Sequence, residues 1–320
     1  MSRAVRAVTQ PYTKPWLSID EQIARIVSRG MSDAADHRSA FEQIGYYRLS
    51  GYWYPFRRLE ADGSRLDDFY PEATFAHVLA LYDFDSRLRG AIWHAVGTVE
   101  LAVRARVAYV LGEVDPFVHL DRRLLDPTVP QYKFERFTAD LEKLQAGSKE
   151  DFVAHFDEKY DGRLPVWSVT EIMQFGQLAR LYEFSPYPAR VAIAKAYGAR
   201  ADELGSWLRA LNIVRNVTAH HGRLWNRGIA IGPQLKHRRA DPLLAHAVGT
   251  AGRSYDTIAV LAYLLRALGR YDVRDGIRRV LDTFPEIPGV HLGMMRVPEG
   301  WATELLWKSR PDDGASADAS

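Results

Sequence analysis

A long stretch without proline, with apolar residues at helical spacing, constrains the fold more than any other part of this sequence. No proline interrupts residues 72–111. The apolar positions recur three or four residues apart, the spacing of one face of an α-helix. These positions are Phe75, Val78, Leu79, Tyr82, Ile92, Val96, Val99, Val103, Val107 and Val110. Gly90 and Gly97 lie within the stretch, so the pattern leaves open whether it forms one long helix or two.

The same kind of spacing runs through most of the chain. Ser18-Ile19-Asp20-Glu21 has the form of a capping box, which predicts the start of a first helix that Gly30 ends. Further helices are expected at residues 36–44, 134–144, 151–160, 164–183, 186–200, 202–220, 255–268 and 274–281. No convincing alternating strand and no internal repeat is present. The predicted fold class is therefore all-α, a helical bundle.

Composition narrows the classes of function. The net charge is only +2 in 320 residues, so any affinity for nucleic acid must come from the placement of charges. Cysteine is absent, which excludes disulfides, thiolate metal sites and cysteine nucleophiles and fits a cytoplasmic location. Neither a signal peptide nor a membrane span is expected. Adjacent His220 and His221 cannot face one metal from a helix, so we predict no metal and no cofactor.

Positive charge is concentrated in one segment. Residues 204–240 contain seven Lys or Arg, three His and no Asp or Glu. An apolar run with helical spacing ends at Val214, so Asn216, His220 and Arg223 are expected on one helical face, with Arg215 on the adjoining flank. A histidine that titrates near neutral pH beside permanent cations suits an anionic ligand. The alternative is a solvated arginine face with an ordinary surface histidine.

Two aromatic features have both a functional and a structural interpretation. The segment GYYRLSGYWYPF (45–56) holds six aromatic residues around Arg48, which could stack bases and contact phosphates. We prefer the interpretation that these rings pack the N-terminal helices onto the main bundle. Trp225 could also stack a base, but burial is the usual fate of a tryptophan in such a position.

The basic segment resembles known families. Arg215-Asn216 followed by His220 is similar to the Arg-x(4–6)-His signature of HEPN-type ribonucleases. The longer string RNVTAHHGRLWNR (215–227) resembles the Abi-like proteins, a bacterial abortive-infection family that includes the AbiD and AbiF types. The resemblance extends to segment 45–56 and to the strings LYDFDSRLRG (81–90) and VELAVRARVAYVLG (99–112).

The resemblance implies an all-helical HEPN-type bundle that acts as a dimeric, metal-independent endoribonuclease and leaves 2′,3′-cyclic phosphate ends. His220 would then be the general acid and base, Arg215 the phosphate clamp, and Asn216 the group that orients the histidine or the substrate. The residues implied for substrate binding are His221, Arg223 and Arg227. The alternative is an RNA-binding protein that holds a structured noncoding RNA without cutting it. A purely structural helical adaptor is a third interpretation.

Glu100 and Arg104 stand four residues apart on the long apolar stretch. Such pairs usually add only a few tenths of a kcal/mol on a helix surface. The functional alternative is that one of them faces the cleft and orients Arg215 and His220.

The expected organisation follows from these segments. We expect a flexible arm (1–13), an Abi-like helical domain (14–232) and a C-terminal helical extension packed on it (233–308), followed by a disordered tail (309–320). Within the domain, N-terminal helices cover 14–57 and the bundle core covers 72–227. The expected partners are RNA, possibly including a cognate noncoding RNA, and a second copy of the chain in a homodimer, with no membrane.

Overall fold

The computed structural model describes residues 13–309 and confirms the predicted all-α class. The expected flexible arm and disordered tail lie outside the described residues, apart from Thr13 and Ser309. The α-helices are α1 (Ile19–Val27), α2 (Arg38–Gln43), α3 (Tyr46–Trp53), α4 (Phe75–Val114), α5 (Gln131–Ala146), α6 (Asp151–Lys159), α7 (Val166–Ile172), α8 (Phe175–Phe184), α9 (Tyr187–Lys195), α10 (Ala201–Ala219), α11 (Tyr255–Ala267) and α12 (Tyr271–Asp282). Short 3-10 helices are η1 (Ser32–His37), η2 (Tyr54–Phe56), η3 (Val118–Leu120), η4 (Arg122–Leu124), η5 (Ala245–Ala247), η6 (Leu292–Met295), η7 (Trp301–Thr303) and η8 (Leu305–Trp307). Among the described residues, every helix is too short or too polar to cross a bilayer.

Internal contacts divide the chain into two compact units. Of the described residues, the first unit comprises 13–83 and 285–290, and the second comprises 84–284 and 291–309. Helix α4 begins in the first unit and continues in the second. The division into a helical domain (14–232) and a C-terminal extension (233–308) stays a prediction.

Side-chain caps fix the two main helix starts of the first unit. The capping box predicted for α1 is present: the Glu21 N–H donates to Ser18 Oγ, and the Ser18 N–H donates to the Glu21 carboxylate at 2.7 Å. At the start of α4, the N–H groups of Phe75 and Ala76 donate to the carboxylate of Asp33 at 2.8 and 2.9 Å. A carboxylate there satisfies two unpaired donors and faces the positive end of the helix dipole.

The aromatic segment 45–56 forms α3 and η2. Tyr52, Trp53 and Phe56 are buried, and the Trp53 ring lies 6.5 Å from the ring of Phe75 at the start of α4. These three rings therefore pack within the first unit, where Trp53 meets the start of α4. Packing of the N-terminal helices onto the rest of the bundle stays a prediction. Tyr47 differs, because 92% of its surface is exposed.

The polar segment after η2 contains a small antiparallel hairpin that sequence patterning does not predict. Strand β1 (Arg57–Leu59) pairs with β2 (Arg65–Phe69). Arginine side chains reinforce the pairing: Arg65 Nη1 donates to the Arg57 carbonyl at 2.8 Å, and Arg57 Nη2 donates to Asp67 Oδ1 at 2.7 Å. Because polar contacts hold these short strands together, they lack the apolar alternation by which a strand is recognised.

Helix α4 answers the question that Gly90 and Gly97 leave open, because it is a single helix of 40 residues. Each glycine weakens a helix by about 1 kcal/mol relative to alanine. Each fully buried aliphatic or aromatic side chain contributes roughly 1.5–3 kcal/mol. The fully buried stripe within the second unit is Phe84, Leu88, Ile92, Val96, Val99, Val103 and Val107. Burial of this stripe outweighs the two glycines, so the helix continues.

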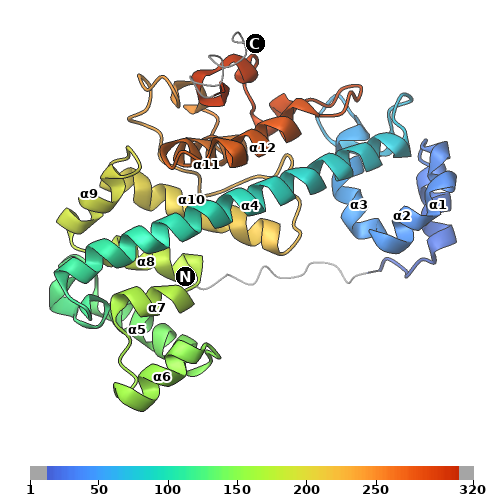
Figure 1. The fold of residues 1–320 in the computed structure, drawn as a ribbon. Helices are drawn as coiled ribbons and strands as arrows, with labels where there is room; N and C mark the ends of the chain where they lie inside the picture. The colour runs from blue at the N-terminus through green and yellow to red at the C-terminus, as the bar shows by residue number, and fades with distance from the viewer. Residues whose placement is uncertain (1–12, 310–320) are drawn as a thin grey trace, which may run out of the picture. The chain divides into compact units, whose positions relative to one another are not determined.

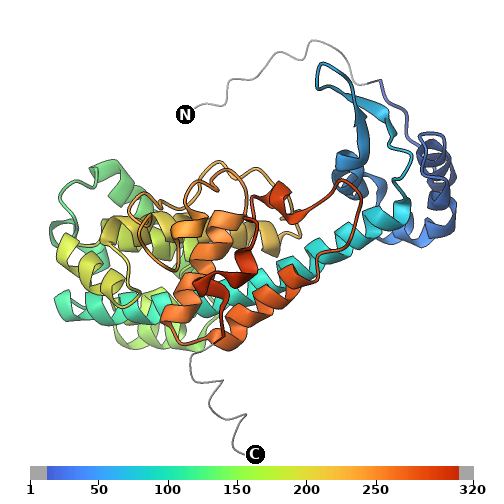
Figure 2. The same cartoon turned by 90° about the horizontal axis from the view of Figure 1, so that it is seen from above.

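The second unit is built around α10. This helix packs against α8, α9 and α11 (Figure 1). Helix α11 lies beside α12, and η8 contacts both (Figure 2). The segment after α12 contains the short 3-10 helices η6, η7 and η8, and its residues Trp301, Leu306 and Trp307 are buried.

The helix predicted at 164–183 is broken into α7 and α8. Met173 and Gln174 have extended backbone angles, and Gln174 begins a new capping box with Gln177. Arg104 of α4 donates from Nη2 to the Met173 carbonyl at 2.8 Å. That carbonyl is available because the helix ends there, so a contact 69 residues away in sequence accompanies the break.

Candidate functional site

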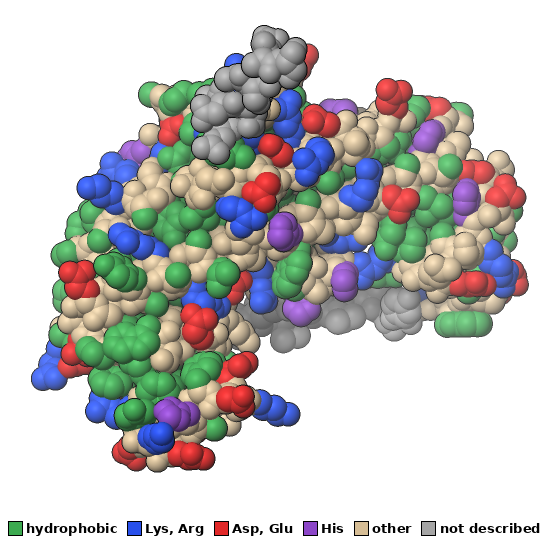
Figure 3. Space-filling view, viewed as in Figure 1, with side chains coloured by type: hydrophobic (Ala, Val, Ile, Leu, Met, Phe, Trp, Pro, Cys, Tyr) green, Lys and Arg blue, Asp and Glu red, His purple; other side chains and the backbone are tan. Residues whose placement is uncertain are grey.

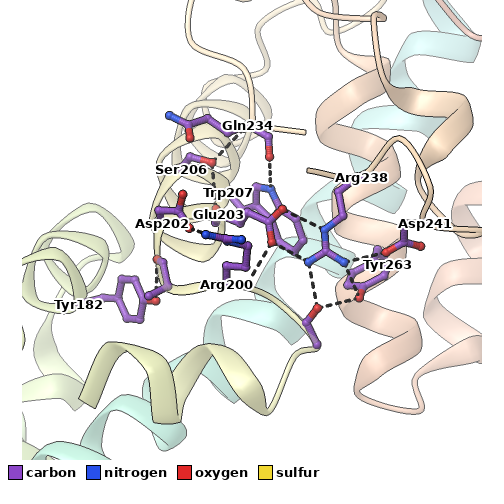
Figure 4. A network of polar contacts seen from close by, with 12 residues as sticks. Tyr182, Arg200, Asp202, Glu203, Ser206, Trp207, Gln234, Arg238, Asp241 and Tyr263 are labelled. Atoms are coloured by element: carbon purple, nitrogen blue, oxygen red, sulfur yellow. Dashed lines mark hydrogen bonds and ion pairs between the residues drawn. The ribbon is translucent and has the colours of Figure 1, made fainter. Parts of the chain in front are cut away.

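The N-terminal half of α10 is fixed by a buried polar network. Arg238 donates to both carboxylate oxygens of Glu203, at 3.0 and 2.7 Å, and to Asp241 at 2.7 Å (Figure 4). Its guanidinium also lies 5.1 Å from the Trp207 ring and 5.2 Å from that of Tyr263. Burial alone lowers the pKa of Arg238, but the carboxylates outweigh burial and raise it. A charged arginine therefore ties the segment at 238–241 to Glu203 of α10 and Tyr263 of α11.

The C-terminal end of α10 carries the predicted motif and closes in a Schellman turn. His220 is the C-cap, with φ −93° and ψ 18°. The His221 N–H donates to the Thr218 carbonyl at 3.1 Å, and the Gly222 N–H donates to the Val217 carbonyl at 2.8 Å. His221 occupies the left-handed position, with φ 53°, where glycine is the usual residue.

This turn corrects one prediction about the motif. We expected Asn216, His220 and Arg223 on one face of a continuous helix. The helix ends at Ala219, and the left-handed His221 turns the chain, so Arg223 lies beyond the helix. Arg215 and Asn216 remain on α10, and His220 stands at its last position.

The segment after the turn is hydrogen-bonded to a buried carboxylate of α4. The N–H groups of Leu224 and Trp225 donate to Asp85 Oδ1 at 3.1 and 2.6 Å. Asp85 is fully buried and forms an ion pair with Arg89 one turn later in α4. Trp225 is fully buried too, which confirms the structural interpretation of this residue. A buried carboxylate thus positions the segment that leads out of the motif.

Arg215 lines a pocket of about 700 Å³ whose other walls are α4 and the connection between α11 and α12, with Leu268 and Arg270. Its guanidinium carbon lies 5.3 Å from the centre of the Trp93 ring. Its Nε is 3.9 Å from Glu100 Oε2, and its Nη1 is 3.4 Å from Asn216 Oδ1. These polar distances are long for a guanidinium, so the charge of Arg215 is only weakly neutralised by the protein.

The Glu100–Arg104 pair lies next to this arginine. Arg104 Nη2 contacts Glu100 Oε1 at 3.0 Å, while the second oxygen of Glu100 faces Arg215. Both side chains of the pair are largely buried, at 10% and 16% exposure. The structure therefore places Glu100 beside Arg215, while Arg104 also donates to the Met173 carbonyl at the end of α7. An orienting role for either residue stays a prediction.

The other predicted residues surround the end of α10. Asn216, His220, His221 and Arg227 are exposed, and Arg223 is half-buried. His221, rather than His220, lines a second pocket of about 370 Å³ together with Arg89 and Trp93. Histidine side chains lie close to Lys or Arg side chains near the centre of the face seen in Figure 3.

Metal binding finds no support in the described part of the chain. Within residues 13–309 no three His, Asp or Glu side chains come together as metal ligands. The nearest carboxylate to Arg215, that of Glu100, is engaged by two arginines.

Three residues of α4 belong to the site although spacing in the sequence does not reveal them. Asp85 holds the post-motif segment, Arg89 pairs with Asp85, and Trp93 contacts Arg215. All three precede the motif by more than 120 positions. The signal that could have found the first two is the string LYDFDSRLRG (81–90), which contains both.

Comparisons with known proteins give one match. A family model described as Abi-like protein matches residues 39–226. This range contains all of α4 and the end of α10, and therefore every residue around Arg215 discussed above except Arg227. No curated protein and no solved structure matches the chain.

Proposed function

Because the chain belongs to the Abi-like protein family, we propose that it is a metal-independent endoribonuclease of a bacterial abortive-infection system. The proposed site comprises Arg215, Asn216 and His220 at the end of α10, and two copies of the chain form it together. The assignment to HEPN-type ribonucleases is part of this proposal.

One observation carries the proposal: Arg215 presents a weakly neutralised guanidinium to an open pocket. Its nearest carboxylate oxygen is 3.9 Å away, whereas Arg238 of the same unit has carboxylate oxygens at 2.7 Å. An arginine held by α10, Trp93 and Glu100 but not satisfied by them is ready to bind an anion. The planar guanidinium matches two oxygens of a phosphate.

The proposed reaction needs no metal. The RNA 2′-oxygen attacks the adjacent phosphorus while a general base removes its proton, and the 5′-oxygen leaves as it receives a proton. The products are a 2′,3′-cyclic phosphate and a 5′-hydroxyl. His220 serves the proton transfers because an imidazole exchanges protons near neutral pH. Arg215 stabilises the additional negative charge on the phosphorane.

The neighbours of these two residues have supporting roles in the proposal. Asn216 is the next residue after Arg215, and its side-chain oxygen lies 3.4 Å from Arg215 Nη1, so it limits the orientations of the guanidinium. Glu100 acts in the same way from the other side. His221, Arg223 and Arg227 bind the RNA on either side of the scissile phosphate.

The proposed reaction uses more catalytic histidines than the single His220 of one chain, so a second copy is part of the proposal. One chain contributes one His220, whereas the reaction uses both a base and an acid. Two copies related by a two-fold axis would bring two histidines and two arginines to one phosphate. The homodimer is therefore part of the proposed function.

The test is cleavage of end-labelled RNA by purified protein in EDTA. We expect the wild-type protein to cut and His220→Ala to lose between roughly 100-fold and 10,000-fold in rate. His237→Ala is the matched control, because His237 is also exposed and lies outside the site. Equal cutting by wild type and His220→Ala would overturn the proposal.

Two further readouts complete the test. Adding excess His220→Ala protein to wild type should lower activity more than dilution does, because mixed dimers form. If neither protein cuts but both retain RNA tightly, the chain is the alternative RNA-binding protein, which would use the same exposed arginines and histidines.

A further inference from the structure

One face of α4 is exposed along much of the second unit. Ser86, Gly90, Trp93, Gly97 and Leu101 recur three or four residues apart, and all are exposed. Trp93 is 47% exposed although tryptophan is usually buried. The exposed face is the side of α4 opposite to its buried stripe.

Trp93 forms a wall of two pockets at once. The larger pocket, of about 700 Å³, contains Arg215 and Arg270. The smaller, of about 370 Å³, contains Arg89 and His221. Trp93 lines both, so its ring stands between two hollows that each hold basic side chains.

Two glycines on this face of α4 line the hollows. Gly90 lines the smaller pocket and Gly97 the larger one. They stand three residues before and four residues after Trp93, on the same face. A Cβ at either position would meet no atom within 4 Å, so close packing does not explain the glycines. Glycine weakens a helix relative to alanine, and its effect here is that α4 itself places no side chain at the positions before and after Trp93 on this face. The Arg215 guanidinium, from α10, lies 5.3 Å from the ring centre.

An aromatic ring between two hollows that are both lined by arginine fits the chemistry of a single nucleic-acid strand. Bases stack on exposed aromatic rings, and the phosphates that flank them are bound by arginine. A paired base has its faces covered by its neighbours in the duplex, so it cannot stack on a protein ring without leaving the helix. The arrangement therefore selects an unpaired nucleotide.

We infer that Trp93 is the stacking platform for an unpaired base next to the scissile phosphate, with neighbouring nucleotides in the two pockets on either side. The inference rests on the proposed function, in which Arg215 holds that phosphate. It assigns a substrate-selecting role to α4, whereas the motif on α10 carries out the reaction. The preferred substrate is RNA that is single-stranded at the cleavage site.

The test measures binding separately from cleavage. Wild-type protein, Trp93→Phe and Trp93→Ala are titrated with a fluorescent single-stranded 2′-O-methyl RNA, which lacks the attacking hydroxyl, and with the same RNA in a duplex. We expect Trp93→Ala to weaken single-strand binding between roughly 5-fold and 150-fold, and Trp93→Phe to weaken it much less. Duplex binding should be weaker and should not depend on residue 93.

A second set of variants probes the pockets without removing the ring. Gly97→Leu places a large side chain in the larger pocket and should weaken single-strand binding, whereas Gly97→Ala should have a small effect. Leucine and alanine both favour helix over glycine, so both variants should fold at least as stably as wild type. Binding unchanged by both Trp93→Ala and Gly97→Leu would overturn the inference.

The oligomeric state provides the remaining outcome. If Trp93→Ala converts a dimer into a monomer at equal concentration, Trp93 is an interface residue and the inference is wrong. Cleavage of unmodified RNA is measured in parallel. If the wild-type protein cuts RNA but Trp93→Ala binds the single strand as tightly as wild type, the inference alone is wrong. If binding depends on Trp93 but the wild-type protein does not cut, the proposed nuclease alone is wrong.

Discussion

The backbone N–H of Trp225 donates to Asp85 Oδ1 at 2.6 Å, joining two residues that are 140 positions apart in the chain. Asp85 is fully buried and also pairs with Arg89. Through this carboxylate, helix α4 fixes the course of the segment that follows His220. Residues of α4 and of α10 therefore form the candidate site together.

Removing the charge of Asp85 should destabilise the protein strongly. Asp85→Asn keeps the shape of the side chain but leaves the buried Arg89 without its carboxylate. Breaking a buried ion pair in this way costs about 3–5 kcal/mol. Denaturant unfolding monitored by circular dichroism measures the loss. Asp83→Asn, at an exposed position of the same helix, is the control and should change stability by less than about 0.5 kcal/mol.

Replacing Arg215 by lysine should impair cleavage although the positive charge is kept. Lysine cannot bind two phosphate oxygens in a planar fork, so we expect the rate to fall roughly 100-fold to 1,000-fold. Arg209→Lys is the matched variant, because Arg209 lies on the same helix and pairs with Glu183. Cleavage rates under single-turnover conditions are the measurement. Similar rates for the two variants would remove Arg215 from the reaction.

The left-handed backbone of His221 predicts a difference between two substitutions. Both His221→Gly and His221→Ala remove the imidazole and its interactions, but only glycine adopts φ 53° without strain. We expect the glycine variant to be more stable than the alanine variant by roughly 1 kcal/mol. Thermal or urea unfolding of the two variants, compared directly, tests this. Equal stabilities would show that the turn relaxes without a left-handed residue.

Burial of Asp256 predicts a pH-dependent loss of stability. Burial raises the pKa of this carboxyl to about 6, from 3.8 in the unfolded chain. Between about pH 4 and pH 6 the folded state holds the proton more tightly, so stability falls as pH rises through this range. A pKa shift of that size lowers the free energy of unfolding by roughly 3 kcal/mol above pH 6, relative to its value below pH 4.

Asp256→Asn removes the ionisable group and should abolish this loss. Relative to wild type, the variant should therefore gain stability between pH 4 and pH 7.5, measured as the shift of the urea midpoint at each pH. Asp68→Asn, at an exposed position, should show no such gain. A constant difference between Asp256→Asn and wild type at all pH values would contradict the burial effect.

Local signals in the sequence predict much of the fold. The capping box at Ser18 and Glu21 depends on residues three positions apart, so it can be read directly and is confirmed. Periodicity locates the long helix, but its continuity through Gly90 and Gly97 depends on burial of the opposite face, which the sequence does not display. The break at Met173 likewise accompanies a contact with distant Arg104.

The candidate site is likewise predictable only where its signals are local in the sequence. Arg215, Asn216 and His220 can be found from their spacing and from the family resemblance. The turn at His221 cannot, because its left-handed residue is a histidine where glycine gives the usual signal. Asp85 and Trp93 reach the site only through folding, since more than 120 residues separate them from the motif.

The hydrogen bond between Trp225 and Asp85 also sets an order of events during protein synthesis. Ribosomes add roughly 5–20 residues per second, so about 7–28 s pass between the synthesis of Asp85 and that of the N–H groups that it binds. Until then α4 is made but the end of α10 is not. A nascent chain that ends before Trp225 therefore cannot carry an assembled site, and the proposed RNA cleavage begins only after most of the molecule has been synthesised.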